Sequence, residues 1–537
     1  MVVPVFGLPN IKTPMKNKLD KSRRNFFKRI FAKDANALLN PYSSLSSQLK
    51  SKLPPLAPMA AEVLFLNRTS FGIAPDDYAR IKSIGIENYL EEQLDYENIA
   101  DSEFEDLIQT AYPLLDYGLP EIVDYIEEGN ALGEDREADT AIQLVSATML
   151  RQLYSKRQLF EVMVEFWSNH FNSDIVKGLD LILKYYEDKH IIRANALTSF
   201  PQILHADAKS ATMMFYLDNY TNTKDGPNEN YARELMELHT LGVDRGYSEQ
   251  DVKEVARCFT GWSIGQNDSD FFEFYDSDHD FAAKIVLGQT IQNEEGIVDG
   301  QQVLDKLAYS STTAGFISEK LVRRFCSDSP DEKLVKTVAK KYLSTDGDIK
   351  SMLRAIFHSP QFLDSVDAKF KRPIEFVTST LRTLDIQSAQ QSTEEKFYPL
   401  FILFKEYQDS GQVPFFWSPP TGYPDVADYW QNISTLLRRI NFANGVAFGD
   451  LLYQSEDGDV PYSYILPYDY SHLIDQAQTA QEIIIQLENS LLHRELLATD
   501  RQLLLDFLQT QNEQEITEEK IRAVIGLLLS STYFQMR

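Results

Sequence analysis

Two histidines stand in the apolar faces of predicted helices, where a titratable ring needs a partner. Segment 226–242, GPNENYARELMELHTLG, is typical of an amphipathic helix with Asn228 as its N-cap. At about 100° per residue its apolar side chains form one broad arc, and His239 falls near the centre of that arc. Burying an unpartnered imidazole costs free energy, so His239 is either a hydrogen-bonded core residue or part of a site.

A second segment, LFEVMVEFWSNHF at 159–171, repeats this arrangement, because His170 lies within an arc of aliphatic and aromatic side chains. A third histidine, His279, stands in an irregular stretch and is flanked by aspartates. Histidine and carboxylate side chains are common ligands of divalent metals and common general bases. We therefore predict that His170, His239 and His279 converge and bind a divalent metal ion.

Acid–base catalysis would use three residues from the same segments. Glu234 lies at the edge of the apolar arc, about 140° from His239, so the two cannot share a ligand from an undistorted helix. Asp280 directly follows the third histidine. The hypothesis assigns catalytic roles to Glu234, His239 and Asp280. The alternative is that each histidine is a core residue bonded to its own carbonyl or carboxylate.

The charge balance limits the kinds of partner. The 537 residues include 52 Lys and Arg against 80 Asp and Glu, a formal net charge of −28. Nucleic-acid binding relies on clustered cations that neutralise phosphates, so we expect no nucleic-acid partner. The two cysteines, Cys258 and Cys326, stand in apolar helical contexts and predict buried thiols, which argues against a disulfide framework or a zinc knuckle.

The N-terminal region differs from the rest of this acidic chain, because residues 1–40 carry nine Lys or Arg and two Asp. Within it, SRRNFFKRIF at 22–31 resembles a twin-arginine export motif, although the following stretch is short and polar for a standard leader. We predict that residues 1–58 form a basic leader with a Pro-rich end. No run predicts a transmembrane segment. We expect a periplasmic or cell-surface location, with the cytoplasm as the alternative.

Helical periodicity dominates from Ala60 onward, and few segments alternate as strands do. The sequence therefore predicts a mainly α fold: a large helical domain, 59–537, with long irregular loops and at most a small β-hairpin, best placed at 265–300. The polar connector 387–395 is the predicted junction if the domain has two subunits. The segment FWSPPTGYPD at 416–425 cannot be helical, and its aromatic residues are expected to hold it against the body.

A series of motifs matches a known family. In chain order they are AEVLFLNRTSFGIAPDD (61–77), FWSNHF (166–171), MMFYLDN (213–219), NENYARELMELHTLG (228–242), DVKEVARCFTGWS (251–263), DHD (278–280), KRPIEFV (371–377), SPPTGYPD (418–425) and LLLSSTYFQMR (527–537). In these motifs the chain resembles the bacterial family catalogued as domain of unknown function 1800. The resemblance implies export and genes that neighbour those of a sulfatase-like family. Many members have histidine where this chain has Ser168, so position 168 is not expected to be an essential ligand.

Two functions follow from these observations. The first is an exported helical protein with a buried His/carboxylate centre that binds metal or performs catalysis, and hydrolysis and redox chemistry both fit it. The second is a non-catalytic scaffold, at the cell surface or in the periplasm, that binds a sulfatase-like partner protein.

Overall fold

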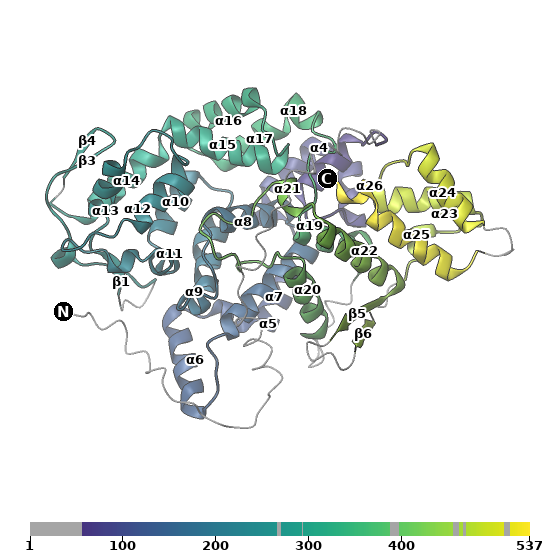
Figure 1. The fold of residues 1–537 in the computed structure, drawn as a ribbon, viewed down its shortest axis with the longest axis horizontal. Coiled ribbons are helices and arrows are strands. Elements are labelled where there is room, and N and C mark those ends of the chain that lie inside the picture. Colours follow the sequence, from purple (N-terminus) through teal and green to yellow (C-terminus); the bar gives the residue numbers. More distant parts are fainter. Residues whose placement is uncertain are drawn as a thin grey trace.

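A computed structural model describes residues 56–537, apart from the segments 266–269, 293, 387–396, 455–460, 466–468 and 510–515. Most of the leader predicted at 1–58 lies outside the described residues, and so does the connector predicted at 387–395. The described chain is built mainly of helices (Figure 1), which confirms the predicted fold class. No helix in this part of the chain is both long enough and apolar enough to cross a membrane.

The N-terminal half is a succession of helices joined by short connections. They are α3 (Ala61–Thr69), α4 (Pro75–Leu94), α5 (Ser102–Ala111), α6 (Leu119–Leu132), α7 (Asp139–Tyr154), α8 (Gln158–His170), α9 (Asp180–Glu187), α10 (Phe200–Ala208), α11 (Ala211–Tyr216), α12 (Asn230–Glu234) and α13 (Glu249–Cys258). Two π-helical segments extend this set, with η4 (Asp188–Arg193) continuing α9 and η6 (Leu235–Thr240) continuing α12.

The C-terminal half continues in the same way. Its helices are α14 (Ile297–Ala308), α15 (Ser311–Phe325), α16 (Glu332–Ser344), α17 (Ile349–Phe357), α18 (Pro360–Leu363), α19 (Pro373–Thr383), α20 (Phe397–Asp409), α21 (Ala427–Trp430), α22 (Ile433–Phe448), α23 (Ala480–Leu487), α24 (Ala498–Leu508), α25 (Glu518–Ser530) and α26 (Thr532–Gln535). A third π-helical segment, η10 (Glu488–Leu492), extends α23.

Strands contribute three separate antiparallel pairs, where the sequence predicted at most one small hairpin. The pairs are β1 (Trp262–Ile264) with β2 (Phe272–Phe274), β3 (Lys284–Val286) with β4 (Gln289–Ile291), and β5 (Asp450–Gln454) with β6 (Pro461–Ile465). The first two pairs lie within the stretch 265–300 or directly beside it, where irregular backbone was expected.

Local capping signals explain where several helices begin. The Ser248 hydroxyl accepts a hydrogen bond from the Asp251 amide, and the Asp251 carboxylate accepts one from the Ser248 amide, which starts α13 as a capping box. The Asp348 carboxylate accepts a hydrogen bond from the Ser351 amide at 2.7 Å and starts α17. These side chains satisfy amide groups that have no partner inside the helix.

The buried apolar side chains form two clusters. The first joins α3, α4, α8 and the helices from α10 to α17. The second joins α5, α6, α7 and α9 to α19 and to the helices that follow it in the chain. The clusters therefore combine segments from distant parts of the sequence, and a division into two subunits at 387–395 stays a prediction.

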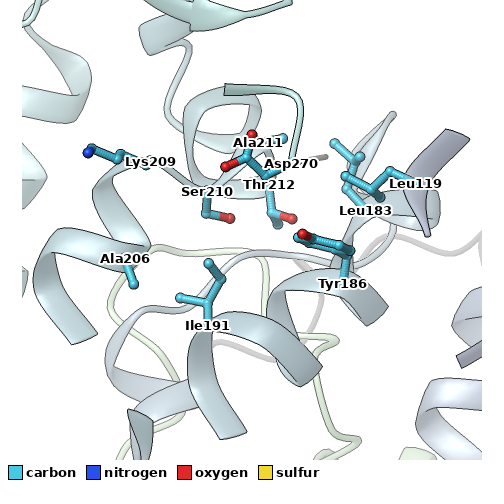
Figure 2. A pocket seen from close by; sticks show the side chains of 10 residues that line it. All are labelled: Leu119, Leu183, Tyr186, Ile191, Ala206, Lys209, Ser210, Ala211, Thr212 and Asp270. Carbon is cyan, nitrogen blue, oxygen red and sulfur yellow. The ribbon is translucent and has the colours of Figure 1, made fainter. Parts of the chain in front are cut away.

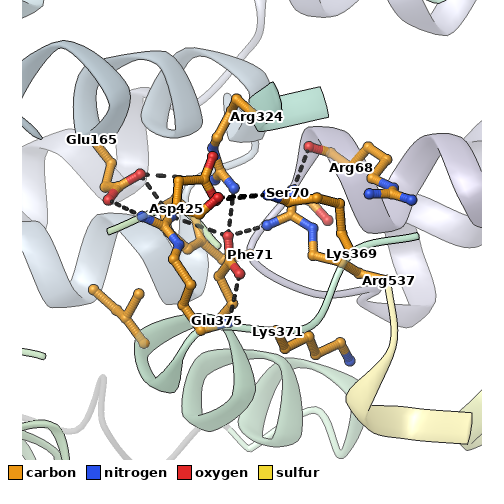
Figure 3. A network of polar contacts seen from close by, with 12 residues as sticks. Arg68, Ser70, Phe71, Glu165, Arg324, Lys369, Lys371, Glu375, Asp425 and Arg537 are labelled. Atoms are coloured by element: carbon orange, nitrogen blue, oxygen red, sulfur yellow. Dashed lines mark hydrogen bonds and ion pairs between the residues drawn. The ribbon is translucent and has the colours of Figure 1, made fainter. Parts of the chain in front are cut away.

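A buried ionic network lies among these helices, and Figure 3 shows it centred on Glu375 of α19. The Glu375 carboxylate accepts hydrogen bonds from Arg324 of α15 at 2.5 Å, from the Arg372 side chain at 3.1 Å, and from Arg537. Burial alone would raise the pKa of Glu375, but Arg372, Arg537 and Arg324 together hold it well below its usual range. The carboxylate is therefore ionised and serves three cations at once.

The same network reaches other parts of the chain. Glu165 of α8 accepts two hydrogen bonds from Arg372, both at 2.9 Å. Arg537 also donates to the backbone carbonyl of Arg68 in α3 at 2.9 Å. Asp425 pairs with Lys369 at 2.9 Å. Four motifs that are far apart in the sequence, 61–77, 371–377, 418–425 and 527–537, thus contribute residues to one buried network.

Glu375→Gln should lower the free energy of unfolding by about 3–5 kcal/mol, because it leaves three buried guanidinium groups without their shared counter-charge. Urea denaturation monitored by circular dichroism measures the loss. The matched control is Glu332→Gln in α16, whose partner Lys336 and whose own side chain are largely exposed. That change should cost less than about 1 kcal/mol. Equal effects of the two substitutions would contradict a central role for Glu375.

Candidate functional site

The structure brings His170 and His239 together, as predicted. His170 is the last residue of α8, and His239 lies in the π-helical segment η6. Their ring centroids are 6.0 Å apart, and His170 Nε2 lies 3.0 Å from the backbone carbonyl oxygen of His239. Both residues are buried, at 2% and 0% exposure. The imidazoles therefore face one another across the contact between α8 and η6.

A lysine that the sequence analysis did not select completes this group. Lys320 of α15 places Nζ 2.7 Å from His170 Nδ1. Because a carbonyl can only accept, His170 donates from Nε2 to the His239 carbonyl, and its Nδ1 accepts from Lys320. Burial, together with the positive charge of Lys320, holds the pKa of His170 well below its ordinary value, so this imidazole is neutral.

His239 has the more unusual environment of the two. Neither of its ring nitrogens has a hydrogen-bond partner among the described residues, although the ring is fully buried against Phe171, 5.2 Å away between centroids. Burial, with a contribution from Lys320, lowers the pKa of His239 to about 3. The ring stays neutral in the folded protein, and its unsatisfied nitrogens cost stability.

His279 has partners of its own. Its Nδ1 donates to the Thr260 carbonyl at 2.7 Å, and its Nε2 lies 3.4 Å from Asp299 and 3.3 Å from Lys284. Lys284 and Asp299 form a buried ion pair at 2.6 Å. These contacts attach the loop after η7 (Asp276–Asp278) to β3 and α14, which is the role of a hydrogen-bonded core histidine.

The predicted three-histidine metal centre therefore finds no support in this geometry. His170 and His239 meet, but His279 is held by Thr260 and Asp299. Across the described residues, no group of three or more His, Cys, Asp or Glu side chains could hold a metal ion. The physical reason is that His170 and His239 lie on helical segments that contact each other, whereas His279 lies in the loop after η7, where Thr260 and Asp299 hold it.

The predicted catalytic set of Glu234, His239 and Asp280 is not assembled either. Asp280 pairs with Arg257 at 2.7 Å and caps the Ala282 amide at 2.9 Å, so its carboxylate is engaged in local structure. Glu234 is half-buried at the end of α12, where burial raises its pKa. No hydrogen bond within the described chain links Glu234 to His239.

A second buried polar group, which we call the acidic cluster, comprises Asp180, Lys184 and Glu187 of α9 and Asp207 of α10. At 3.6 residues per turn the three α9 residues project within an arc of about 60°. All four residues are at most 1% exposed. Lys184 forms an ion pair with Glu187 and donates to the Ser173 hydroxyl at 2.7 Å. Three carboxyl groups thus share one lysine.

The carboxyl groups of Asp180 and Asp207 are left without partners. None of their four oxygens has a hydrogen-bond partner among the described residues. Burial and the charge of Glu187 raise the pKa of each well above its ordinary value, against a smaller opposing effect of Lys184. A carboxylate in such a place would lose several kcal/mol of solvation, so these groups hold protons under conditions where exposed aspartates are ionised.

The acidic cluster and the histidine pair belong to one set of helices. Tyr231 of α12 is fully buried with an unpartnered hydroxyl, and burial and the charge of Asp207 raise its pKa. His239 lies about two helical turns beyond Tyr231, in the π-helical segment that continues α12. Phe200, at the start of α10, packs against His170 at 6.1 Å, and Asp207 lies near the end of that helix. The acidic cluster, Tyr231 and the histidine pair therefore form one row of buried polar groups within an otherwise apolar core.

A cavity of about 210 Å³ is lined in part by residues that directly precede members of the acidic cluster in the chain, and Figure 2 shows its lining, to which the acidic cluster residues themselves do not belong. Leu183 and Tyr186 of α9 and Ala206 of α10 form part of its wall, and they alternate in sequence with the acidic cluster residues. Lys209 and Ser210 add polar groups. The helices α9 and α10 thus contribute both to the acidic cluster and to part of the cavity wall, and α6, η4 and α11 supply other wall residues.

The sequence contained a signal for the acidic cluster that helical periodicity could have found. In DLILKYYE the charged residues recur at i, i+4 and i+7 while every other position is apolar or aromatic. A charged stripe of this kind usually faces solvent. Only the packing of α9 against α7 and α11 reveals that here the stripe is buried.

The neutral state of buried His239 predicts a pH dependence of stability. Its folded pKa of about 3 lies below the ordinary 6.5, so the unfolded chain binds an extra proton between these values. The stability contributed by this group is complete above pH 6.5 and is lost as pH falls, by about 1.4 kcal/mol per unit. Between pH 6.5 and pH 5 the free energy of unfolding of His239→Phe should therefore fall by about 2 kcal/mol less than that of the wild type, as measured by urea denaturation.

Other buried groups titrate in both proteins, so the difference between the two isolates His239. The control is His358→Gln, at a side chain that is 49% exposed and pairs with Glu87 on the surface. This variant should follow the wild-type pH profile. An unchanged profile for His239→Phe would mean that the folded protein can protonate His239 at little cost.

Comparison with known proteins gives one result. The sequence model of a family described as "Protein of unknown function (DUF1800)" matches residues 64–536. Neither the curated proteins nor the solved structures gave a match. The match spans nearly all of the described chain and includes the acidic cluster, the histidine pair and the Glu375 network. The chain therefore belongs to the DUF1800 family of proteins of unknown function.

Proposed function

We propose that the protein is an acid–base enzyme of the hydrolase class whose reactive groups are the acidic cluster. The observation that carries this proposal is Asp207. Its carboxyl group is fully buried and has no hydrogen-bond partner among the described residues, and burial and Glu187 raise its pKa. Strongly perturbed buried carboxyl groups beside a second carboxyl group are typical of proton-transfer sites.

The environments of the carboxyl groups divide the roles. Asp207 lacks a cation of its own, so it retains its proton and serves as the general acid. Burial raises the pKa of Glu187 too, but the charge of Lys184 opposes that effect, so Glu187 is the group of the three that ionises and activates water as the general base. Asp180 adds a further proton-holding group beside Glu187.

The cavity lined in part by α9 and α10 defines the class of substrate. Its wall is largely apolar, formed by side chains such as Leu183, Tyr186 and Ile191, and a lysine and hydroxyl groups lie at one part of it (Figure 2). A volume of about 210 Å³ fits a small molecule or one group of a larger one. We propose a substrate with an apolar body and an anionic or hydroxyl group that Lys209 and Ser210 bind.

A second candidate function is the non-catalytic scaffold that binds a sulfatase-like partner. It is favoured by the start of α22, where Ile433, Leu436 and Leu437 are 79%, 44% and 56% exposed. We propose Leu437→Glu as its test, with co-purification of the sulfatase-like protein as the readout. Export through the segment 22–31 remains part of both proposals, and fusion of that leader to a reporter enzyme tests it.

Asp207→Asn should abolish activity and raise stability together. The folded pKa of Asp207 lies above its ordinary 3.8, so the folded state binds more protons between these values, and this group's stabilisation at low pH is lost as pH rises. Replacing the Asp207 carboxyl group with an amide removes this loss of stability at higher pH. At pH 8 the variant should exceed the wild type by at least about 1 kcal/mol in unfolding free energy, and the difference should shrink toward pH 4.

The activity arm screens ester, amide and glycoside substrates with the wild type, then measures Asp207→Asn and Glu187→Gln on whatever is hydrolysed. Each variant should lose roughly 10²–10⁴-fold in kcat. The control for stability is Asp331→Ala, since Asp331 caps α16 by accepting from the Leu334 amide at 2.9 Å and alanine cannot replace that cap. A structural aspartate of that kind should lose stability. If Asp207→Asn also loses stability at pH 8, the proposal is wrong.

A further inference from the structure

Lys320 is held in a way that differs from most other buried lysines of this protein. Lys184, Lys284 and Lys369 each form an ion pair with a buried or half-buried carboxylate. Lys320 forms no ion pair with a carboxylate in the described part of the chain, and its Nζ makes a hydrogen bond to His170 Nδ1 at 2.7 Å. An ammonium group without a counter-charge is poorly stabilised when water is removed.

The imidazole partner favours the neutral amine of Lys320. His170 donates from Nε2 to the His239 carbonyl, so its Nδ1 presents a lone pair toward Lys320. His170 cannot supply a negative charge, and Asp425, whose charge acts on Lys320, is engaged by Lys369. Burial, with the charge of Arg323, lowers the pKa of Lys320 to about 8. A large fraction of this side chain is therefore free amine near pH 8.

Accessibility separates Lys320 from a second lysine with a similar electrostatic state. Lys371 has its pKa lowered to about 7 by burial, but it is only 5% exposed and lies over the ring of Phe534. Lys320 is half-buried at the surface of α15. Lys320 is therefore the more exposed of the two residues.

The groups around Lys320 indicate what kind of molecule would approach it. The Phe316 ring lies 5.5 Å from Lys320 Nζ, and Arg245 stacks on the same ring at 5.6 Å. Arg323 and Arg245 both pair with Glu319, which leaves one positive charge in excess. An aromatic face beside surplus guanidinium charge attracts a small planar anion.

From this geometry we propose that Lys320 is a nucleophilic amine that forms an imine with an aldehyde or ketone bearing an anionic group. The free amine adds to the carbonyl carbon and gives a carbinolamine, and loss of water from that adduct forms the C=N bond. One N–C bond forms, the C–O bond breaks, and nothing is oxidised or reduced. His170 is a positioning residue that accepts an N–H hydrogen bond from the Lys320 amine and leaves the nitrogen lone pair free to add to a carbonyl carbon.

The test uses the full chain, incubated at pH 8 with about one equivalent of pyridoxal 5′-phosphate or, separately, glyoxylate. Imines are trapped with cyanoborohydride and located by peptide mass spectrometry. Lys320 should be modified at least about tenfold more than Lys209, Lys336 or Lys371. Lowering the pH to 6 should slow its modification roughly fiftyfold, as expected for an amine with a pKa of about 8. The two probes distinguish a phosphate-bearing from a carboxylate-bearing ligand, and preferential labelling by either one supports the proposal.

Variants separate this inference from the proposed hydrolase. Lys320→Arg should remove the labelled peptide, while Lys209→Arg and Asp207→Asn should leave labelling of Lys320 unchanged. The main labelling experiment uses the wild-type protein, so its result does not depend on whether a variant folds. Labelling spread evenly over the exposed lysines, or an unmodified Lys320 beside modified neighbours, would overturn the proposal.

Discussion

The ionised carboxylate of Glu375 is the constraint on which the rest of the fold depends. It holds Arg324, Arg372 and Arg537 in one buried place, and each of these residues comes from a different part of the chain. Removing such charges from water is costly, and the cost is recovered only when all partners are in position. The network therefore favours one arrangement of α3, α8, α15 and α19 over near alternatives. In this arrangement the backbone at Gly72 packs closely against α19, because a Cβ atom on Gly72 would lie 2.3 Å from Ser379 Cα.

Within that framework, the unusual polar groups coincide with irregular helix geometry. The segment η4 begins directly after Glu187, and η6 contains His239. A π-helical turn widens the helix, displaces side chains from the regular spacing, and often occurs at functional positions. In this protein both turns lie where α9, α10 and α12 bring ionisable groups into an apolar core. The π-helical backbone of η4 and η6 and the unpartnered polar side chains therefore occur in the same region, where packing departs from the regular pattern.

Sequence patterns predicted the elements well and the site in part. His170 and His239 were identified because the apolar arc around each is visible in a single helix, and burial of both arcs brings the rings together. His279 was misassigned because its partners, Asp299 and Lys284, come from elements whose packing no local pattern specifies. Asp207 was missed because its helix gives no sign that an acid faces inward. The Glu375 network was invisible for the same reason, since its members are paired only by the tertiary fold.

The separation between Arg68 and Arg537 has a consequence for how the protein is made. They are 469 positions apart and are joined by a direct hydrogen bond. At roughly 5–20 residues per second, a ribosome needs about half a minute to a minute and a half to synthesise that interval. Once α15 has been made, the nascent chain carries Arg324 and the apolar faces of α3 and α15 without the segment that completes their surroundings. The Glu375 network can therefore close only after residues 527–537 have left the exit tunnel.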